Sequence, residues 1–256
     1  MIKIKTKEEL AIMAQSGKML AETLFAVLAA VKPGISELEI DALAEKLIRE
    51  KGGEPGFQKV PGYRHATCIS TNDVVVHGIP TQYQVKEGDV VGVDCGVYYN
   101  GFHTDMAETI RVRSSKSKNK NDEIDKFLSI GKKALEAGIN QANAGNHVGD
   151  ISKAIQDIVE VENGYSVVRS LVGHGVGREL HEDPEVPGYL AEPIAKTPLL
   201  REGMVIAVEV IYNVGNGEVV YSGGDDWTIR TRDGSLSGLF ERTIQISGGK
   251  PIILTK

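Results

Sequence analysis

The sequence is poor in aromatic residues and in cysteine, and it contains no long apolar run. Aromatic side chains make up 5% of the 256 residues, and Trp227 is the only tryptophan. Two cysteines, Cys68 and Cys95, are too few for a disulfide framework and too far apart for a zinc-finger pair, as is typical of reduced, cytosolic proteins. No segment has the roughly 20 apolar residues of a membrane span, and the first residues, MIKIKTKEEL, lack the apolar core of a signal peptide. We therefore expect a cytoplasmic protein with no membrane contact.

The sequence also lacks an excess of positive charge. Its 35 acidic and 29 basic residues give a formal net charge of −6, which argues against a nucleic-acid-binding protein with a broad basic face. Hydrophobic residues at 41% are sufficient to build a core. Lysines do gather in the stretch SSKSKNKN at 114–121. This stretch predicts a solvated loop, and contact with an anionic partner is the alternative.

Hydrophobic periodicity divides the chain into groups of helices and groups of strands. The capping-box sequences at 6–9 and 36–39 each precede apolar residues spaced three or four apart, which predicts two helices. Further helices are expected near 122–141 and 147–162. Strands are expected at 66–71, 89–98, 102–112, 204–212, 218–221, 227–231, 240–246 and 252–254. This order favours an α+β fold over a parallel sheet and suggests a duplicated helix-plus-sheet unit, although the length lies between one ordinary domain and two.

The segment 93–110, VDCGVYYNGFHTDMAETI, carries the most specific pattern. Its dipeptide Asn100-Gly101 is typical of a two-residue hairpin turn, because both turn positions need positive φ. In such a hairpin, Asp94 and Asp105 are diagonal neighbours on one face. Two adjacent aspartates repel each other unless a cation neutralises them. The residues alone leave a solvated polar face and a shared binding site about equally favoured.

Three further residues favour a binding site. Glu209 is the only charged residue in the apolar strand MVIAVEVIY, and a buried carboxylate is costly unless it is paired or binds a metal. Glu241 lies in the expected strand LFERTIQI, where a surface ion pair with Arg242 is the alternative. His174 lies in the glycine-rich stretch VGHGVGRELH, whose backbone can approach a ligand closely. Four carboxylates and one imidazole suit manganese, iron, cobalt or zinc, and two such divalent ions would neutralise the four acids.

These five residues stand in the order and the contexts found in type I methionine aminopeptidases, which the chain resembles over nearly its whole length. The matching stretches are ISTNDVVVHGIP, VDCGVYYNGFHTD, GHGVGRELHEDP, GMVIAVEV and DDWTIRTRDGSLSGLFERT. The resemblance implies the pita-bread fold, in which two helix-plus-antiparallel-sheet halves are related by a pseudo-two-fold axis, within one catalytic metallopeptidase domain spanning 1–256. It also implies an exopeptidase that removes the N-terminal methionine from nascent proteins and peptides by dinuclear-metal hydrolysis, preferring a small second residue.

The resemblance implies a role for each candidate ligand. Asp94 would chelate one divalent ion, and Asp105 and Glu241 would bridge two ions. His174 and Glu209 would bind the other ion, and Glu209 would also serve as the proton shuttle. Cobalt, manganese, iron and zinc all remain open as the physiological metal.

The resemblance also implies a substrate pocket. His77 matches the family's histidine beside the scissile peptide bond, and His181 matches the histidine that stabilises the substrate carbonyl, so we expect both to be catalytic and to bind substrate. The methionine side chain is expected to lie in an apolar pocket whose wall includes Tyr63, Cys68 and Trp227, with His77.

The chain departs from the family pattern at several positions. Leu180 stands where many relatives carry an aromatic residue, and the stretch 56–68 has one tyrosine where relatives often have two. Leu239 and Arg242 replace a glutamine and a histidine that usually lie beside the last glutamate. We expect these departures to alter the pocket shape and the hydrogen bonding of Glu241, and to leave the ligand set unchanged.

Other members of the fold are less compatible with this sequence. Proline-specific aminopeptidases and dipeptidases usually carry an additional N-terminal domain, for which Asp94 comes too early. Type II methionine aminopeptidases have a helical insertion for which there is no room between His174 and Glu209. Non-catalytic binding proteins of the fold lose metal ligands. The resemblance implies a monomer that acts on nascent polypeptide N-termini with no direct nucleic-acid function, and the stretch 114–121 is the best support for a transient contact with the ribosome.

Overall fold

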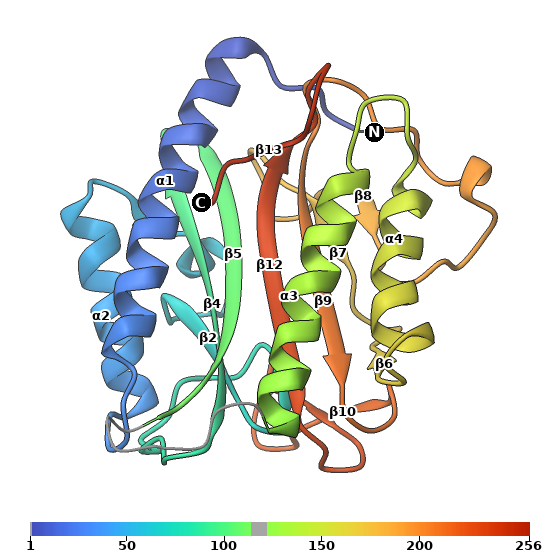
Figure 1. Cartoon of the computed structure of the whole chain (residues 1–256). Coiled ribbons are helices and arrows are strands. Elements are labelled where there is room, and N and C mark those ends of the chain that lie inside the picture. The colour runs from blue at the N-terminus through green and yellow to red at the C-terminus, as the bar shows by residue number, and fades with distance from the viewer. Residues whose placement is uncertain (1, 114–121) are drawn as a thin grey trace.

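The computed structural model describes residues 2–113 and 122–256, and within them a pair of helices followed by strands occurs twice (Figure 1). The first half has α1 (Lys7–Ala30), α2 (Glu37–Glu50), β1 (Glu54–Pro55), β2 (Thr67–Thr71), β3 (Val74–Val76), β4 (Val90–Tyr99) and β5 (Phe102–Arg111). The second half has α3 (Glu123–Gln141), α4 (Val148–Gln156), β6 (Ser166–Val167), β7 (Gly173–Gly175), β8 (Glu182–Val186), β9 (Val205–Asn213), β10 (Val219–Tyr221), β11 (Ile229–Thr231), β12 (Ser237–Gln245) and β13 (Ile252–Ile253). This order confirms the predicted arrangement.

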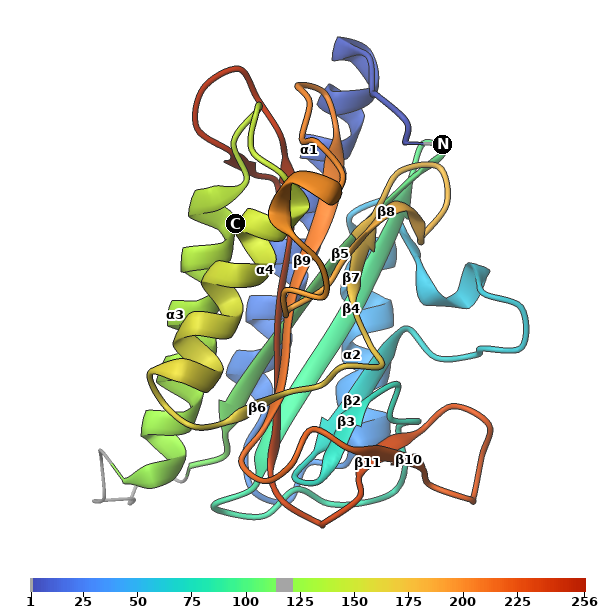
Figure 2. The same ribbon diagram turned by 90° about the vertical axis from the view of Figure 1, so that its right-hand side faces the viewer.

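The strands form antiparallel sheets, and each half has its own hydrophobic core. In the first sheet β4 pairs with β1, β2 and β5; in the second, the order is β13-β12-β9-β7-β8, with β6 also paired to β9. Apolar residues of α1 and α2 pack on the first sheet, and those of α3 and α4 pack on the second. Seen from the side, α3 and α4 lie on one side of the long strands, and the hairpin of β10 and β11 lies on the other (Figure 2). The face of the sheets away from the helices is therefore available for a site.

Both predicted capping boxes are present and fix where the first two helices begin. The hydroxyl of Thr6 accepts the Glu9 N–H at 3.3 Å, and the Glu9 carboxylate accepts the Thr6 N–H at 2.9 Å. Ser36 and Glu39 make the same reciprocal pair at 3.2 and 2.8 Å. Each pair satisfies two N–H groups that a helix start otherwise leaves without partners, so the local sequence is sufficient to specify these boundaries.

The predicted hairpin register is confirmed. Asn100 and Gly101 both have positive φ, at 47° and 88°, so the turn between β4 and β5 has the conformation that the dipeptide favours. Asp94 lies opposite Ala107 in the ladder, which makes Asp94 and Asp105 diagonal neighbours. The opposite face of β4 carries Val91, Val93, Cys95 and Val97, all fully buried in the first core. The two aspartates therefore lie on the face of the sheet away from α1 and α2.

Several strands differ from the sequence expectation. β1, β3, β6, β7 and β8 were not expected, because they have two to five residues and show no alternation that could be recognised in the sequence. The last expected helix is also divided, since α4 ends at Gln156 and continues as a π-helical turn over Asp157–Val161. β11 begins at Ile229, so Trp227 lies before the strand rather than within it.

The two halves meet in the ladder between β3 and β11 and also where β5 lies beside β12, a contact here called the central interface. No backbone ladder joins β5 to β12; instead, threonine hydroxyls bridge them. The Thr243 hydroxyl accepts the Asp105 N–H at 2.9 Å and donates to the Asp105 carbonyl at 2.7 Å. The Thr109 hydroxyl likewise accepts the Leu239 N–H at 3.0 Å and donates to the Leu239 carbonyl at 2.7 Å. Thr243 thus binds Asp105, four positions before Thr109, and Thr109 binds Leu239, four positions before Thr243. Such reciprocal contacts are expected for halves related by a pseudo-two-fold axis.

Within residues 2–113 and 122–256, no helix combines the length and the apolar character needed to cross a bilayer. The lysine-containing stretch 114–121, predicted to be a solvated loop or a contact for an anionic partner, lies outside the described residues.

Candidate metal centre

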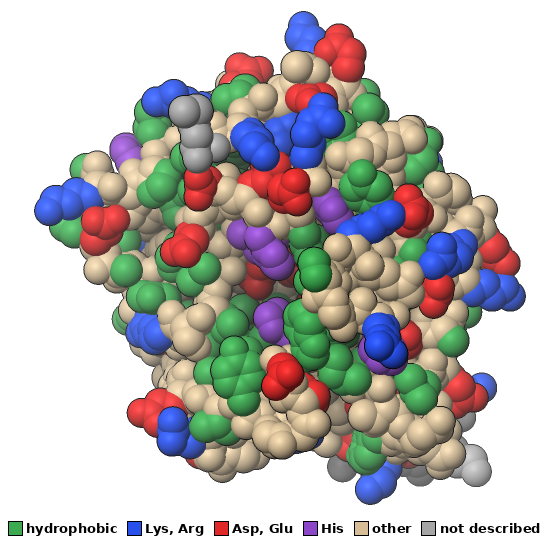
Figure 3. Space-filling model, turned by 180° about the vertical axis from the view of Figure 1, so that it is seen from behind, with side chains coloured by type: hydrophobic (Ala, Val, Ile, Leu, Met, Phe, Trp, Pro, Cys, Tyr) green, Lys and Arg blue, Asp and Glu red, His purple; other side chains and the backbone are tan. Residues whose placement is uncertain are grey.

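A cavity of about 340 Å³ lies between the two halves. Seen from behind the view of Figure 1, histidine side chains gather in a hollow among acidic and apolar side chains (Figure 3). The cavity brings together every residue that the sequence nominated for the site: Tyr63, Cys68, His77, Asp94, Asp105, His174, His181, Glu209, Trp227 and Glu241. Residues from both halves therefore contribute to one cavity.

Four long strands supply the carboxylates. Asp94 comes from β4 and Asp105 from β5, while Glu209 of β9 lies directly opposite Glu241 of β12 in the ladder. Asp94 in the first half corresponds to Glu209 in the second. Asp94 faces Ala107, which lies two positions after Asp105, the residue bound by Thr243. Glu209 faces Glu241, which lies two positions after Leu239, the residue bound by Thr109. The pseudo-symmetry of the fold thus brings acids from far apart in the chain to one point.

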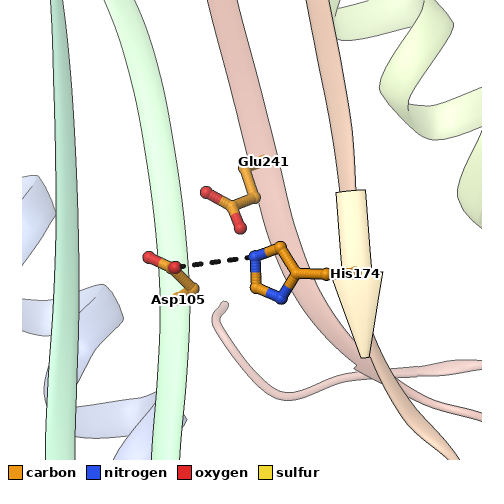
Figure 4. Close-up of side chains that lie close together, drawn as sticks. All are labelled: Asp105, His174 and Glu241. Atoms are coloured by element: carbon orange, nitrogen blue, oxygen red, sulfur yellow. Dashed lines mark ion pairs between the residues drawn. The ribbon is translucent and has the colours of Figure 1, made fainter. Parts of the chain in front are cut away.

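His174 of β7 completes the cluster and is oriented by its own backbone. Ligand atoms of Asp105, His174 and Glu241 all lie within 4.8 Å of one another (Figure 4). The Nε2 atom of His174 lies 3.4 Å from Glu209 Oε1 and 3.9 Å from Asp105 Oδ2. Its Nδ1 atom lies 2.8 Å from the Gly175 carbonyl oxygen, which only accepts, so Nδ1 carries the proton. Burial lowers the pKa of His174 to about 3, which leaves Nε2 with a free lone pair toward the acids.

The acids cannot all be ionised without a cation. Burial, followed by the charges of neighbouring acids, raises the pKa of Asp94, Glu209 and Glu241 well above the ordinary carboxylate value. Burial also raises the pKa of Asp105 to about 7. Asp94 Oδ1 and Glu241 Oε1 are buried without a hydrogen-bond partner. Buried carboxylate oxygens that lack donors, facing an imidazole nitrogen, fit hard or borderline divalent ions such as manganese, iron, cobalt or zinc.

The alternative of a surface ion pair for Glu241 is wrong, because Glu241 is only 2% exposed. Arg242 instead donates to the main-chain carbonyls of Glu241, at 2.7 Å, and Ala107, at 3.1 Å. It also donates to the Glu108 carboxylate at 2.6 Å. Arg242 therefore acts on the backbone of Glu241 and binds β12 to β5 across the central interface.

Sequence reasoning did not identify the residues of the central interface. Thr109 and Thr243 lie in the similar segments AETI and ERTI, and that likeness was the available signal. It is only four residues long, so it does not stand out from chance similarity without the structure.

Replacing Thr243 with valine is expected to lower the free energy of unfolding by about 1–3 kcal/mol, because the buried N–H and carbonyl of Asp105 lose their partner. Thr109→Val is the matched control, since it does the same to Leu239. We expect only Thr243→Val to weaken divalent-metal binding, by about tenfold, because Asp105 is a candidate ligand. Urea denaturation and isothermal titration calorimetry measure the two effects. Equal metal affinity in the two variants would show that Thr243 does not position Asp105.

Two histidines outside the cluster border the cavity. His77 has a positive φ of 55°, which is costly for a residue with a side chain and is typical of functional sites. Burial, followed by the charge of His181, lowers the pKa of His77 to about 4. The ring of His181 lies edge-on to that of His174, with 4.4 Å between centroids, and burial lowers its pKa also. Both imidazoles are therefore neutral near pH 7 and can donate one hydrogen bond.

An apolar wall closes the other side of the cavity. Phe57, Tyr63, Cys68 and Leu180 are buried together there, with Trp227 packed against them. The Tyr63 hydroxyl donates to the Thr67 carbonyl at 2.7 Å, and the Tyr63 and Trp227 rings meet edge-to-face at 5.1 Å. Burial raises the pKa of Cys68 and of Tyr63, so both side chains stay uncharged.

Comparison with known proteins agrees with this geometry. Residues 11–238 match metallopeptidase family M24. The chain is 43% identical to methionine aminopeptidase of Clostridium perfringens, over 100% of this chain and 99% of that one. It is 41% identical to methionine aminopeptidase 1 of Bacillus subtilis over the full length of both.

Solved structures show the same relationship. Methionine aminopeptidase of Thermotoga maritima superposes with a TM-score of 0.93 at 39% identity, over 100% of both chains. Prolidase of Pyrococcus furiosus has a TM-score of 0.77 at 24% identity, over 99% of this chain and 65% of that one, which shows the shared fold alone. The chain therefore belongs to the methionine aminopeptidases of metallopeptidase family M24 and has their α+β pita-bread fold.

Proposed function

We propose that this protein is a methionyl aminopeptidase whose residues 1–256 form one catalytic domain. It removes the N-terminal methionine from nascent proteins and peptides, preferring a small second residue. The observation that carries the proposal is one cavity in which four carboxylates and an imidazole converge beside an apolar pocket. The family membership supports the same reaction.

Asp94, Asp105, His174, Glu209 and Glu241 would hold two divalent metal ions. Support comes from the raised carboxylate pKa values, from the free Nε2 of His174, and from buried carboxylate oxygens without donors. Bound ions of this kind supply Lewis-acid chemistry, by polarising a carbonyl group and activating water near neutral pH.

The remaining steps belong to side chains of the protein. Glu209 accepts the proton of the attacking water on a carboxylate oxygen and passes it to the leaving amine. His181 donates an N–H to the carbonyl oxygen as negative charge develops there. His77 contacts the peptide beside the scissile bond.

The side chain of the substrate's N-terminal methionine lies against the apolar wall of the cavity. Tyr63, Cys68, His77 and Trp227 line the cavity there, and the thioether gains from contact with aromatic ring edges. Leu180 also lies in this wall, where many relatives have an aromatic residue, so we expect contacts with the substrate to be less aromatic at that point.

The partners follow from this activity. The substrates are N-termini of nascent polypeptides in the cytoplasm, and the enzyme acts as a monomer without a nucleic-acid function of its own. A transient ribosome contact through 114–121 remains a prediction, since that stretch lies outside the described residues.

A panel of tripeptides that differ at one position tests the proposal. We expect kcat/KM for Met-Ala-Ser to exceed that for Leu-Ala-Ser by about 100-fold, because the pocket selects the first side chain. Release of free methionine is measured by chromatography. The prolidase neighbour motivates the contrasting peptides Ala-Pro-Ser and Leu-Pro-Ser. Preferential cleavage before proline, whatever the first residue, would contradict the proposal.

A further inference from the structure

A buried carboxylate outside the cavity holds the chain segment that forms the apolar wall. Asp41 of α2 is 7% exposed, and its Oδ1 atom accepts the N–H groups of Ala66 and Thr67, both at 2.9 Å, and the Thr67 hydroxyl at 2.8 Å. Its Oδ2 atom lies 3.0 Å from His65 Nδ1. Four contacts therefore fix three consecutive residues from one side chain.

These three residues lie between two members of the wall, Tyr63 and Cys68. The Thr67 carbonyl accepts the Tyr63 hydroxyl at 2.7 Å, and the Cys68 thiol donates to the Tyr63 oxygen at 3.1 Å. The Tyr63 ring in turn lies against Trp227. A continuous series of contacts thus connects Asp41 to the wall, although Asp41 does not line the cavity.

Outside Asp41, the segment is held by separate, scattered contacts: the Tyr63 N–H donates to the Val60 carbonyl at 3.1 Å, and Gln58 Nε2 donates to the Arg64 carbonyl at 3.2 Å. Residues 61–66 precede β2 and belong to no helix or strand. Gly62 has a positive φ of 88°, so this segment turns sharply before Tyr63. The buried N–H groups of Ala66 and Thr67 donate to Asp41, and losing that acceptor would leave both unpaired. Asp41 is therefore one of the groups on which the position of Tyr63 depends.

We propose that Asp41 is a positioning residue for the substrate side-chain pocket. It fixes 63–68 so that Tyr63 stays against Trp227, which keeps the wall narrow enough to favour an unbranched side chain. The inference rests on the proposed methionyl aminopeptidase function. Because Asp41 acts through the wall and not on the reacting atoms, its loss changes substrate binding and selectivity more than turnover.

Glu37 provides a matched control on the same helix. It is 6% exposed and also binds three donors: the Thr71 hydroxyl at 2.7 Å, the Thr81 N–H at 3.0 Å and the Thr81 hydroxyl at 2.7 Å. Neither Thr71 nor Thr81 lines the cavity. Removing Glu37 therefore costs a comparable set of buried hydrogen bonds without freeing the wall.

The test compares Asp41→Ala with Glu37→Ala, and the milder pair Asp41→Asn with Glu37→Gln, which remain informative if the alanine variants do not fold. For Asp41→Ala we expect KM for Met-Ala-Ser to rise about tenfold while kcat changes less than about threefold. The preference for Met-Ala-Ser over Leu-Ala-Ser falls about tenfold, because the widened wall admits a branched side chain. Asp41→Asn shifts the same quantities in the same direction by a smaller factor, and both Glu37 variants keep the wild-type values.

A second measurement does not depend on turnover. Trp227 is the only tryptophan, so its fluorescence reports directly on the wall. In Asp41→Ala its emission shifts to longer wavelength as Tyr63 moves away, and free L-methionine, titrated by this signal, binds about tenfold more weakly. The Glu37 variants keep the wild-type emission.

The outcomes separate this inference from the proposed function. Wild-type activity toward Met-Ala-Ser is measured first, and its absence would overturn both. If the wild type is active, unchanged KM, selectivity and emission in both Asp41 variants overturn the role of Asp41 alone. Equal changes in the Glu37 variants would also overturn it, because they would assign the effect to general loosening of α2.

Discussion

Alanine at Asp105 or at Glu209 is expected to reduce methionine release from Met-Ala-Ser by at least about 10³-fold while the protein remains folded. Asp105 is 4% exposed, and Glu209 lies 3.4 Å from His174 Nε2, so each carboxylate contributes to the same buried cluster. Under the proposed mechanism, loss of either removes a metal ligand, and loss of Glu209 also removes the proton shuttle. Single-turnover release of methionine is the measurement.

The stability of these variants separates loss of chemistry from loss of fold. In metal-free protein the clustered acids are unfavourable, as their raised pKa values indicate. Removing one acid relieves that cost, so the metal-free variants are expected to melt at or above the wild-type temperature. The gain in Tm on adding metal is expected to shrink. Glu179→Ala, an exposed acid near the site, is the control and should keep full activity. Wild-type-like turnover in Asp105→Ala or Glu209→Ala would contradict the assignment of these residues as metal ligands.

Removal of metal by a chelator is expected to abolish activity and to leave clustered acids that stabilise the folded protein more at pH 5 than at pH 8. In the folded protein the pKa of Asp105 is raised from 3.8 to about 7, and Asp94, Glu209 and Glu241 are raised also. At these acids the folded state therefore holds protons that the unfolded chain has released, and the stability that they contribute falls as pH rises from the unfolded pKa near 4 through the folded value near 7. Burial lowers the pKa of His77 to about 4 and that of His174 to about 3, so these histidines act in the opposite sense, in the wild type and in Asp105→Ala alike. Relative to Asp105→Ala, we therefore expect the Tm of the wild type to fall by about 5 °C over this range.

Added manganese, cobalt or zinc should reverse this pH dependence. Divalent ions bind the ionised carboxylates, so they stabilise the folded state more at pH 8 than at pH 5. Scanning calorimetry of the metal-free and metal-loaded protein across pH measures both trends. Asp105→Ala is the comparison, because it lacks one of the acids and keeps the histidines. Full activity in the metal-free protein would contradict the four-acid centre. The same conclusion would follow if the Tm of the metal-free wild type rose from pH 5 to pH 8 as steeply as that of Asp105→Ala.

The sequence by itself determined the features that local chemistry specifies. Reciprocal capping by Thr6 and Ser36 fixed two helix starts, because a cap is made within four residues. The Asn100-Gly101 turn fixed the hairpin register, and the register placed Asp94 beside Asp105. A lone charge in an apolar strand singled out Glu209, because burial of an unpaired carboxylate is costly. The resemblance to a known family then assigned roles that these patterns could only suggest.

Only the tertiary structure decided how the halves fit together. The central interface depends on Thr109 and Thr243, whose partners lie on the other half of the chain, so no local pattern reveals them. Glu241 has an arginine next to it in sequence, and only its position between the halves shows that its side chain is buried and that its Oε1 atom lacks a hydrogen-bond partner. Asp41 looks like an ordinary polar residue of an amphipathic helix until its distance to Thr67 is known. Contacts between distant segments depend on packing of the whole chain, and periodicity carries no information about which distant residue will be the partner.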